Sequence, residues 1–539
     1  MGMSTVAFEV VETLRDLGVK YVFGVPSGGW VDYMDALRAT DGIEFILATH
    51  EGGAAMMADV CGRLTGVPGV CFGTFGPGAT NLATGVGGAL LDRSPMIALT
   101  DEMPAELRGR TVQMGIDHQA LFAPLTKKTT RLEAGAVRAI LQDAAAIATA
   151  ERRGPVHVGL PAGLSAQTVE TGAATHISTE PVIAENLPAA LALIEQASRP
   201  VLAIGLGAAR ANLKPKLIRL AEAYNIPVVL TPMAKGMLPE DHPLYAGVLF
   251  HALSDIVGQT HRQADLVIGV GYDPVEFNYE SWMPKSAPLV SFDVDPADID
   301  RSQYKVAADV VGDIDASLDF LLSRNVAAKT GWDLDELAAR RQELFARLIP
   351  SGERFGSMGA LAALRQVLPR SGIMTCDVGA HTHLIGQLWR TPEPGLQIMT
   401  NGWSSMGFGL PAAIGAKLAR PDLAVCAVVG DGGFLMTAGE LATAVRYGIK
   451  IVVVVLTDND LALIRIKQEK KGKPIYGTPI RAKGTIGGPD IFGVPVTTCF
   501  DQSSFKAALE QAFAADGPVI VEAVVDSREY DGVVLRKDK

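Results

Sequence analysis

The sequence predicts an α/β protein made of three doubly wound parallel sheets, and three observations favour this class. Short apolar runs of strand length alternate with helical patterns rich in Ala, Leu, Glu and Arg, which is typical of parallel sheets covered by helices on both faces. A chain of 539 residues is too long for one core and should form roughly three domains. Polar or Pro-rich breaks near residues 165–188 and 325–355 suggest where the domains divide.

We therefore expect a first domain over residues 1–170, a central Rossmann-like domain over 185–330 and a third domain over 350–539. The first and third have parallel layouts, each with a glycine-rich turn from strand to helix. The expected strands, in chain order, are KYVFGV (20–25), GVCFGT (69–74), MIALT (96–100), PVHVGL (155–160), PVLAIGL (200–206), IPVVLT (226–231), DLVIGVG (265–271), LVSFDV (289–294), GIMTCDVG (372–379), AVCAVVG (424–430), IKIVVVVL (449–456) and PVIVEAVV (518–525).

Composition narrows the class of protein. The net charge of −11 is spread along the chain without long single-sign blocks, which argues against nucleic acid as a partner. The five cysteines lie mostly in apolar runs without metal-binding spacing, so we expect buried free thiols in a reducing compartment. The acidic, amphipathic N-terminal segment is unlike a signal or transit peptide. With no apolar stretch of about 18 residues to suggest a membrane span, we expect a cytoplasmic protein.

Two neighbouring strands of the third domain each end on a carboxylate. Gly430-Asp431-Gly432-Gly433 follows one apolar run, and Thr457-Asp458-Asn459-Asp460 follows the next. A glycine-rich strand end that opens a helix exposes N–H groups suited to a phosphate, and adjacent parallel strands deliver both carboxylates to one crevice. Asp431, Asp458 and the main-chain carbonyl of Asp460 would suit Mg²⁺. Capping of a helix or turn would explain either aspartate alone, but not both at this spacing.

These residues resemble the cofactor motif of the thiamin diphosphate (ThDP) enzymes, in which GDG is followed some two dozen residues later by an Asn-Asn or similar pair. The resemblance implies ThDP and Mg²⁺ as cofactors and makes Gly430, Asp431, Gly432, Gly433 and Asp458 cofactor ligands. Thr457-Asp458 stands where many members have two asparagines, so this site carries one more negative charge.

A second segment, HEGGAAMMADVCG, followed by CFGTFGPGATNLATG, is similar to the part of this family that carries the catalytic glutamate. Taken alone, Glu51 at a helix start would more often be a dipole partner or capping residue. The resemblance implies that Glu51 lies beside the pyrimidine ring nitrogen and promotes removal of the thiazolium proton. It also implies that Gly76, Pro77, Gly78 and Asn81 form the loop around the pyrimidine.

Two more segments of the third domain match the family. In NGWSSMGFGLPAAIGAKLARP, Met406 resembles the large apolar residue that holds the cofactor in its bent shape, and the Ser404 carbonyl would meet the cofactor's amino group. Read without the family, Met406 would be core filler. In CDVGAHTHL, His381 resembles a diphosphate ligand, although a lone histidine there is more often structural.

Overall the chain looks most similar to acetolactate synthase and its relatives, especially the catabolic type that lacks a flavin. The segments IDHQALFAPLTKKT and VIGVGYDPVEF carry this likeness, which implies that Lys127 and Gln113 face the active site as catalytic residues. Biosynthetic members have an arginine where Tyr272 stands and a tryptophan where Lys467 stands. Arg465 and Lys467 could instead meet a carboxylate or sulfonate, or form a solvated basic helix face.

Two further segments allow a functional and a structural interpretation. Gly205 and Gly207 follow a strand of the central domain, but a lone glycine pair is weak evidence for a dinucleotide, so we expect a structural role and no required FAD. Residues 463–490 are polar, basic and Gly-rich, which is typical of either a mobile lid or an ordinary surface excursion.

The resemblance implies ThDP- and Mg²⁺-dependent decarboxylation of a pyruvate-like 2-oxoacid with carboligation to a second carbonyl, in a homodimer or homotetramer. Alternatives within enzymes are a simple 2-oxoacid decarboxylase and a sulfoacetaldehyde acetyltransferase-like enzyme. A protein that binds ThDP only as a sensor or scaffold would not need Glu51. A Rossmann-type flavin or nicotinamide oxidoreductase would need a ribose-binding acid, which the strand IPVVLT does not provide at its end.

Overall fold

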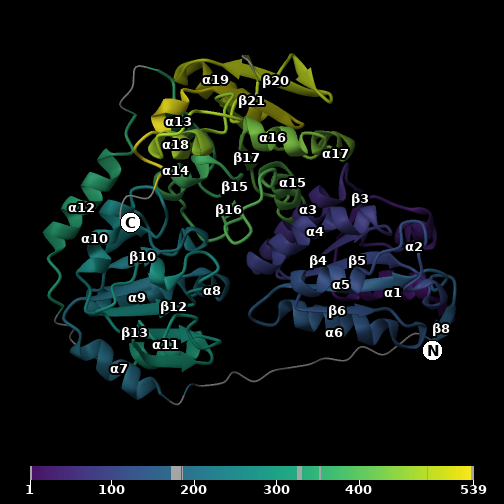
Figure 1. Cartoon of the computed structure of the whole chain (residues 1–539), viewed down its shortest axis with the longest axis horizontal. Coiled ribbons are helices and arrows are strands. Elements are labelled where there is room, and N and C mark those ends of the chain that lie inside the picture. Colours follow the sequence, from purple (N-terminus) through teal and green to yellow (C-terminus); the bar gives the residue numbers. More distant parts are fainter. Residues whose placement is uncertain are drawn as a thin grey trace.

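A computed structural model of the chain describes residues 3–170, 184, 186–324, 330–350, 354–481 and 484–535. It contains three large, mainly parallel sheets, each with helices on both faces (Figure 1). The first unit (purple to blue) lies at the right of Figure 1, the central unit (teal) at the left and the third (green to yellow) at the top. The predicted α/β class with three doubly wound sheets is confirmed.

The first sheet has six parallel strands in the order β3-β2-β4-β5-β7-β6. Its strands are β2 (Tyr21–Gly24), β3 (Glu44–Leu47), β4 (Gly69–Gly73), β5 (Met96–Glu102), β6 (Lys128–Arg131) and β7 (Pro155–Pro161), and a two-stranded antiparallel ribbon joins β1 (Met3–Thr5) to β8 (Thr168–Glu170). The helices are α1 (Val6–Asp16), α2 (Val31–Ala39), α3 (Glu51–Thr65), α4 (Pro77–Leu91), α5 (His118–Phe122) and α6 (Val137–Thr149).

The central sheet has six parallel strands in the order β11-β10-β9-β12-β13-β14, which is the strand order of a Rossmann fold. Its strands are β9 (Pro200–Ile204), β10 (Val228–Leu230), β11 (Tyr245–Val248), β12 (Leu266–Val270), β13 (Leu289–Asp293) and β14 (Val306–Val311). The helices of this part of the chain are α7 (Leu187–Gln196), α8 (Leu206–Arg210), α9 (Lys214–Tyr224), α10 (Ser254–Arg262), α11 (Ile314–Leu322) and α12 (Leu334–Ala346).

The third sheet has seven strands in the order β16-β15-β17-β18-β21-β20-β19, and only the edge pair β19–β20 is antiparallel. Its strands are β15 (Ile373–Cys376), β16 (Gln397–Met399), β17 (Val425–Gly430), β18 (Val452–Thr457), β19 (Asp490–Ile491), β20 (Val494–Cys499) and β21 (Val519–Val524). The helices are α13 (Ser357–Val367), α14 (Ala380–Leu388), α15 (Gly409–Ala419), α16 (Asp431–Thr437), α17 (Glu440–Arg446), α18 (Ala462–Lys470) and α19 (Gln502–Ala514).

The first and third sheets share one strand order, apart from the extra edge strand β19. In each, the first strand of the unit lies between the second and the third, so the chain reverses direction between β2 and β4 and again between β15 and β17. In open α/β sheets, ligands bind at such switch points, outside the carboxyl ends of the strands. The loops after β4 and β17 therefore lie at the two positions where this topology favours a ligand.

Every apolar run that was expected to form a strand contains one. The strands that the sequence did not reveal include the edge strands β3, β6, β11, β14 and β16, which are short or partly polar. Much of the expected break at 165–188 lies outside the described residues. The expected break at 325–355 contains α12, which Asp333 caps and whose Leu337 and Leu344 are buried.

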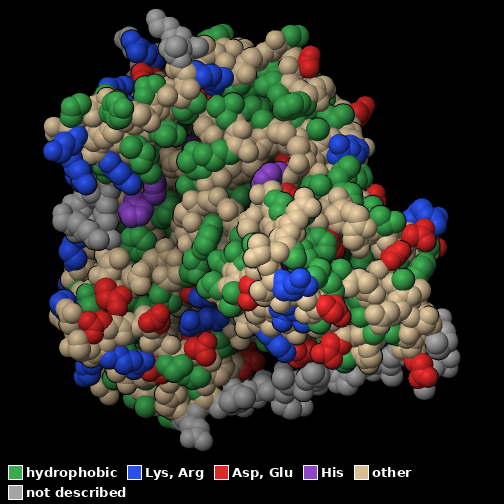
Figure 2. Space-filling view, turned by 45° about the vertical axis from the view of Figure 1, so that its right-hand side comes forward, with side chains coloured by type: hydrophobic (Ala, Val, Ile, Leu, Met, Phe, Trp, Pro, Cys, Tyr) green, Lys and Arg blue, Asp and Glu red, His purple; other side chains and the backbone are tan. Residues whose placement is uncertain are grey.

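The first and third units pack directly against each other through α3 and α15, seen side by side in Figure 1. Small residues allow this approach, because a Cβ at Gly415 would lie 2.5 Å from the Met57 carbonyl oxygen. Acidic and basic side chains are interspersed over the face of the molecule shown in Figure 2. Among the described residues, no helix is both long enough and apolar enough to cross a membrane.

Candidate active site

The diphosphate half of the predicted site forms where β17 and β18 end. The two strands pair in parallel with Gly430 opposite Leu456, so the turn at Asp431 lies beside the loop that follows Thr457. The Asp431 carboxylate accepts hydrogen bonds from the main-chain N–H of Gly432 and of Asn459, both at 2.9 Å. The structure thus brings the two predicted carboxylate loops together.

Negative charge is concentrated in this loop. Burial, together with the nearby Asp431 carboxylate, raises the pKa of Asp458 to about 7. Arg481 provides partial compensation, because its guanidinium lies 3.5 Å from Asp431 Oδ2. Carboxylates that repel each other in a desolvated site favour a bound cation.

His381 lies on the first turn of α14, beside the glycine turn. Its ring atom Cε1 would be 3.3 Å from a Cβ placed on Gly430. The side chain is buried, its Nε2 has no hydrogen-bond partner, and burial lowers the pKa of His381 to about 4. An unpartnered buried ring nitrogen at this position is available to a diphosphate oxygen.

Met406 and Asp377 pack against the same glycine turn. The Met406 methyl group would be 3.3 Å from a Cβ at Gly432, which leaves little room for a side chain, and an Asp377 carboxylate oxygen would be only 2.1 Å from a Cβ at Gly433, which favours glycine there. Asp377 also accepts the Gly407 N–H at 2.9 Å, and burial raises its pKa to about 7. The sequence analysis missed Asp377, although it follows a strand directly in the quoted segment CDVGAH.

The pyrimidine half of the predicted site forms after β3 and β4. Glu51 begins α3 with only 8% of its surface exposed. Asn81 Nδ2 on α4 donates to Glu51 Oε2 at 2.9 Å, and the other carboxylate oxygen would be 3.3 Å from a Cβ at Gly78. The predicted residues of both segments therefore meet around one buried carboxyl group.

A residue that the sequence did not reveal links Glu51 to the third unit. Glu440, at the start of α17, accepts the N–H groups of Thr49 and His50 at 3.1 and 3.0 Å. A Cβ at Gly53 would be 2.4 Å from the same carboxylate. Glu440 thereby fixes the entry to α3, where Glu51 lies.

The structure does not bring Lys127 to this site. Its ammonium donates to the carbonyls of Ile147 and Ala150 at 2.6 and 2.7 Å, which caps the end of α6. Lys127 precedes β6, whereas Glu51 follows β3, so the two lie at opposite edges of a parallel sheet. Because its ammonium is already used, this geometry argues against the predicted catalytic contact.

Gln113 and Ser404 are both exposed. Gln113 precedes Met114, whose carbonyl oxygen would be 2.8 Å from a Cβ at Gly76, so it lies next to the predicted pyrimidine loop. Ser404 adopts a left-handed backbone conformation with φ 55°, and its hydroxyl donates to the Asn401 carbonyl at 2.9 Å. Within the part of the chain that the structure describes, neither residue is hydrogen-bonded to Glu51.

Three residues that were considered for substrate recognition have different surroundings. Tyr272 is buried, and its hydroxyl donates to the Phe277 carbonyl and accepts from Trp282 Nε1 at 2.7 Å. Arg465 is 4% exposed, and its ion pairs with Asp460, Glu469 and Asp531 measure 3.0, 2.8 and 3.1 Å. The idea that Arg465 meets a substrate anion is therefore wrong, whereas Lys467 is exposed.

The segment after α18 covers the metal loop. Leu461 N donates to the Thr478 carbonyl at 2.9 Å and Ile480 N to the Asn459 carbonyl at 2.9 Å. Asn459 Nδ2 also donates to the Gly484 carbonyl at 2.9 Å. Of the two interpretations of residues 463–490, these contacts favour a cover over an unrelated surface excursion.

The glycine pair of the central unit is used in packing. A Cβ at Gly205 would be 2.4 Å from the Gly271 carbonyl oxygen, and one at Gly207 would be 3.0 Å from the Gly271 Cα. The loops after β9 and β12 therefore touch at the switch point of this sheet. This close packing explains why both positions are glycine.

Comparisons with known proteins identify the family to which the chain belongs. Residues 4–121, 187–321 and 377–523 match the N-terminal thiamine pyrophosphate-binding domain, the central domain and the C-terminal thiamine pyrophosphate-binding domain of the thiamine pyrophosphate enzymes. The chain belongs to the thiamine pyrophosphate enzyme family.

Within that family the chain is acetolactate synthase-like, since its curated relatives match nearly end to end. It is 32% identical to a probable acetolactate synthase large subunit of Methanocaldococcus jannaschii, over 96% of this chain and 92% of the relative. It is 30% identical to the acetolactate synthase of Bacillus subtilis, over 98% and 94%. It is also 30% identical to the acetolactate synthase isozyme 1 large subunit of Escherichia coli, over 96% and 94%.

The residues present fit thiamin diphosphate. The unpartnered His381 Nε2 and the N–H groups of the Gly430–Gly433 turn suit a diphosphate. The paired carboxylates of Asp431 and Asp458 suit a divalent cation. Glu51, held by Asn81, presents a buried carboxyl group at the other half of the predicted site.

Proposed function

We propose that this enzyme decarboxylates pyruvate, or a closely similar 2-oxoacid, with thiamin diphosphate and Mg²⁺, and joins the remaining fragment to a second 2-oxoacid to give acetolactate or a related 2-hydroxy ketone. One observation carries the proposal: the Gly76 loop after β4 and the Asp431 turn after β17 follow equivalent strands of two sheets with one strand order, and Glu51 is hydrogen-bonded to Asn81 on the helix that the Gly76 loop opens. The relatives named acetolactate synthase support the reaction and its substrate.

Bound thiamin diphosphate supplies the reactive carbon and the electron sink for decarboxylation. Glu51 would hold a proton at the pyrimidine nitrogen, and Asn81 would keep its carboxylate in place. Gly76, Pro77 and Gly78 would line the pyrimidine, with the Ser404 carbonyl accepting from its amino group. Met406 would support the bend.

At the other end, Asp431, Asp458 and the Asp460 carbonyl would hold Mg²⁺. His381 and the N–H groups of Gly430, Gly432 and Gly433 would bind the diphosphate. The cover formed by residues 478–481 would exclude water. Arg481 now lies beside Asp431, and it would move away when Mg²⁺ binds, because the guanidinium and the metal ion are both positively charged.

The charge around α18 bears on the identity of the second substrate. Lys467 on α18 is exposed and could bind a substrate anion. Burial lowers the pKa of the nearby His383, and the charges of His251 and Lys467 add to this effect. A cationic surface there favours an anionic second substrate. Sulfoacetaldehyde with phosphate is therefore the second candidate, ahead of plain decarboxylation.

We also propose a homodimer or homotetramer in the cytoplasm, with domains 1–170, 185–330 and 350–539. Leu435 and Met436 on α16 are 52% and 62% exposed beside the proposed diphosphate site, which favours a covering second copy. The relatives named large subunits make a second kind of subunit an additional candidate. The buried free thiols, as predicted for all five cysteines, support a reducing compartment.

The test is an incubation with ThDP, Mg²⁺ and a panel of 2-oxoacids together with sulfoacetaldehyde, followed by product identification. We expect pyruvate to give acetolactate, with one carbon dioxide released per acetolactate formed. Acetaldehyde as the main product would identify a simple decarboxylase. Acetyl phosphate formed from sulfoacetaldehyde only with added phosphate would identify the acetyltransferase. No turnover of any substrate in the panel would overturn the proposal.

A further inference from the structure

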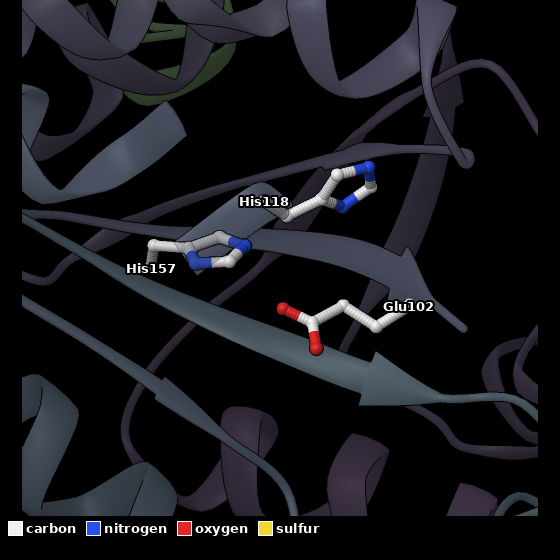
Figure 3. Close-up of side chains that lie close together, drawn as sticks. All are labelled: Glu102, His118 and His157. Atoms are coloured by element: carbon white, nitrogen blue, oxygen red, sulfur yellow. The ribbon is translucent and has the colours of Figure 1, made fainter. Parts of the chain in front are cut away.

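A buried polar cluster of the first unit lies outside the residues assigned above. Glu102 on β5, His118 on α5 and His157 on β7 are buried, and one ligand atom of each lies within 4.8 Å of the others. Figure 3 shows the three side chains lying close together, with the His157 ring and the Glu102 carboxylate pointing toward each other. Such a group could hold a metal ion, or it could hold protons in a fixed order.

The hydrogen bonds decide between these two roles. His118 Nε2 accepts the main-chain N–H of Gly76 at 3.1 Å, so this nitrogen carries no proton. His118 is therefore neutral with its proton on Nδ1, which lies 3.0 Å from Thr100 Oγ1. Nδ1–H donates to that hydroxyl.

The chain of hydrogen bonds continues from Thr100 through His157 to Thr129. The Thr100 hydroxyl, already an acceptor, donates to His157 Nε2 at 2.8 Å, so His157 also carries its proton on Nδ1. That proton is donated to Thr129 Oγ1 at 2.6 Å. All four ring nitrogens thus have a partner, and none is left for a metal.

Beyond the histidines, the chain of hydrogen bonds ends on a carboxylate. The Thr129 hydroxyl donates to Gln119 Oε1 at 2.7 Å, and Gln119 Nε2 donates to Glu102. Arg131 forms an ion pair with the other Glu102 oxygen. Every donor points in one direction, from Gly76 to Glu102, and such chains strengthen cooperatively.

Gly76 is where this chain meets the cofactor site. It has φ +52° and opens α4, the helix that carries Asn81. We propose that His118 is a positioning residue that holds the Gly76 loop for the pyrimidine of thiamin diphosphate, and that the Thr100–His157–Thr129–Gln119–Glu102 chain keeps it in its Nδ1-protonated neutral form. This inference rests on the proposed assignment of Gly76 to the pyrimidine.

A proton on either ring breaks the chain. On His118 it would place N–H against the Gly76 N–H, and on His157 it would leave the Thr100 hydroxyl without an acceptor. Burial is the largest cause that lowers the pKa of His118, with Arg131 acting in the same direction and Glu102 and Asp117 opposing it. Burial also lowers the pKa of His157, aided by His118 and Arg131.

The lowered pKa values of the two histidines set the pH dependence of the chain. Because both histidines have pKa values below the ordinary value near 6.5, the neutral chain is complete above about pH 6.5 and is lost as the pH falls through the lowered values. ThDP affinity should therefore fall with acid.

The experiment measures the ThDP dissociation constant by calorimetry with saturating Mg²⁺ between pH 5 and 8. His118→Asn shortens the side chain so that no acceptor reaches the Gly76 N–H, and Thr100→Val removes the hydroxyl between the rings without touching the loop. We expect each to weaken ThDP binding about fivefold to tenfold at pH 7.5. Thr100→Ser should restore binding.

His118→Gln keeps an acceptor that does not titrate, so it should bind ThDP more tightly than His118→Asn and should lose the acid-dependent part of the profile. His242→Gln is the matched control, because His242 contacts Glu222 in the central unit and should leave the profile unchanged. If one variant does not fold, the other position carries the test.

Two results would overturn the inference: variants at both positions that bind ThDP as the wild type does at every pH, or a metal ion retained in stoichiometric amount by wild type and lost from His118→Asn. If the wild type itself binds no ThDP, the proposed function fails instead, so the two failures are distinguishable.

Discussion

At the scale of single residues, the diphosphate half of the site is distinguished by the additional negative charge of Asp458. The aspartate lies in a desolvated loop beside Asp431, and this pairing raises its pKa to about 7. Arg481 approaches Asp431 at 3.5 Å, which offsets part of the repulsion. In the free protein the loop therefore carries a charge that Mg²⁺ would relieve.

We expect Asp458→Asn to raise the melting temperature of the metal-free protein by a few degrees, because it removes one of two like charges and keeps an oxygen ligand. The additional stabilisation by Mg²⁺ and ThDP should be smaller than in wild type. Thermal denaturation with and without the cofactors measures both effects.

Asp516→Asn, at an exposed position, is the matched control and should change neither value. A metal-free Asp458→Asn protein that melts below the wild type would contradict the account of charge repulsion.

Single residues also mark the limit of the sequence analysis. Glu51, Asn81, Asp431 and Asp458 could be predicted because each lies in a short local motif. Asp377, Glu440 and the His118–Glu102 chain could not, because their partners are distant in sequence. Glu440, for example, is 390 residues from His50, and nothing near either residue signals the contact.

At the scale of elements, α18 separates two basic residues that look alike in the sequence. Arg465 faces inward, where Asp460, Glu469 and Asp531 surround its guanidinium. Lys467, two positions later, lies on the exposed side. Since successive helix residues point about 100° apart, neighbours in sequence take different environments.

We expect Arg465→Ala to lower the free energy of unfolding of the third unit by about 3 kcal/mol, because it leaves Asp460 without its cation in a largely buried place. Lys467→Ala is the matched control and should change stability by no more than about 0.5 kcal/mol. Thermal or urea denaturation compares the two.

Lys467→Ala should instead weaken the use of an anionic second substrate, which the rate of product formation measures. Equal stability of the two alanine variants would show that the ion pairs of Arg465 contribute nothing.

Elements also differ in how well the sequence predicted them. Interior strands such as β17 and β18 are buried on both faces and read as continuous apolar runs. The edge strand β6, with the sequence KTTR, has no such run, because only one of its sides pairs with the sheet. Helix α12 was missed because its polar face dominates the segment, although Leu337 and Leu344 are buried.

At the scale of the whole molecule, the first and third units present equivalent ligand positions on two copies of one topology. The sequence indicated their parallel layouts, but the shared strand order emerges only from the pairing of strands. Within one chain the units pack through α3 and α15, while α16, which begins at Asp431, exposes Leu435 and Met436. This arrangement favours sites shared between two copies.

The most direct test of the central claim is co-expression of Glu51→Gln and Asp431→Asn chains, followed by purification of the mixed dimer and measurement of pyruvate turnover. Each variant alone should lose at least about a hundredfold in kcat. If Glu51 of one chain and Asp431 of the other act on one thiamin diphosphate, the purified mixed dimer should recover up to about half of wild-type activity, because it keeps one of its two sites intact. A mixed dimer as inactive as the single variants would contradict a shared site, and full activity of Glu51→Gln alone would contradict the role of its carboxyl group.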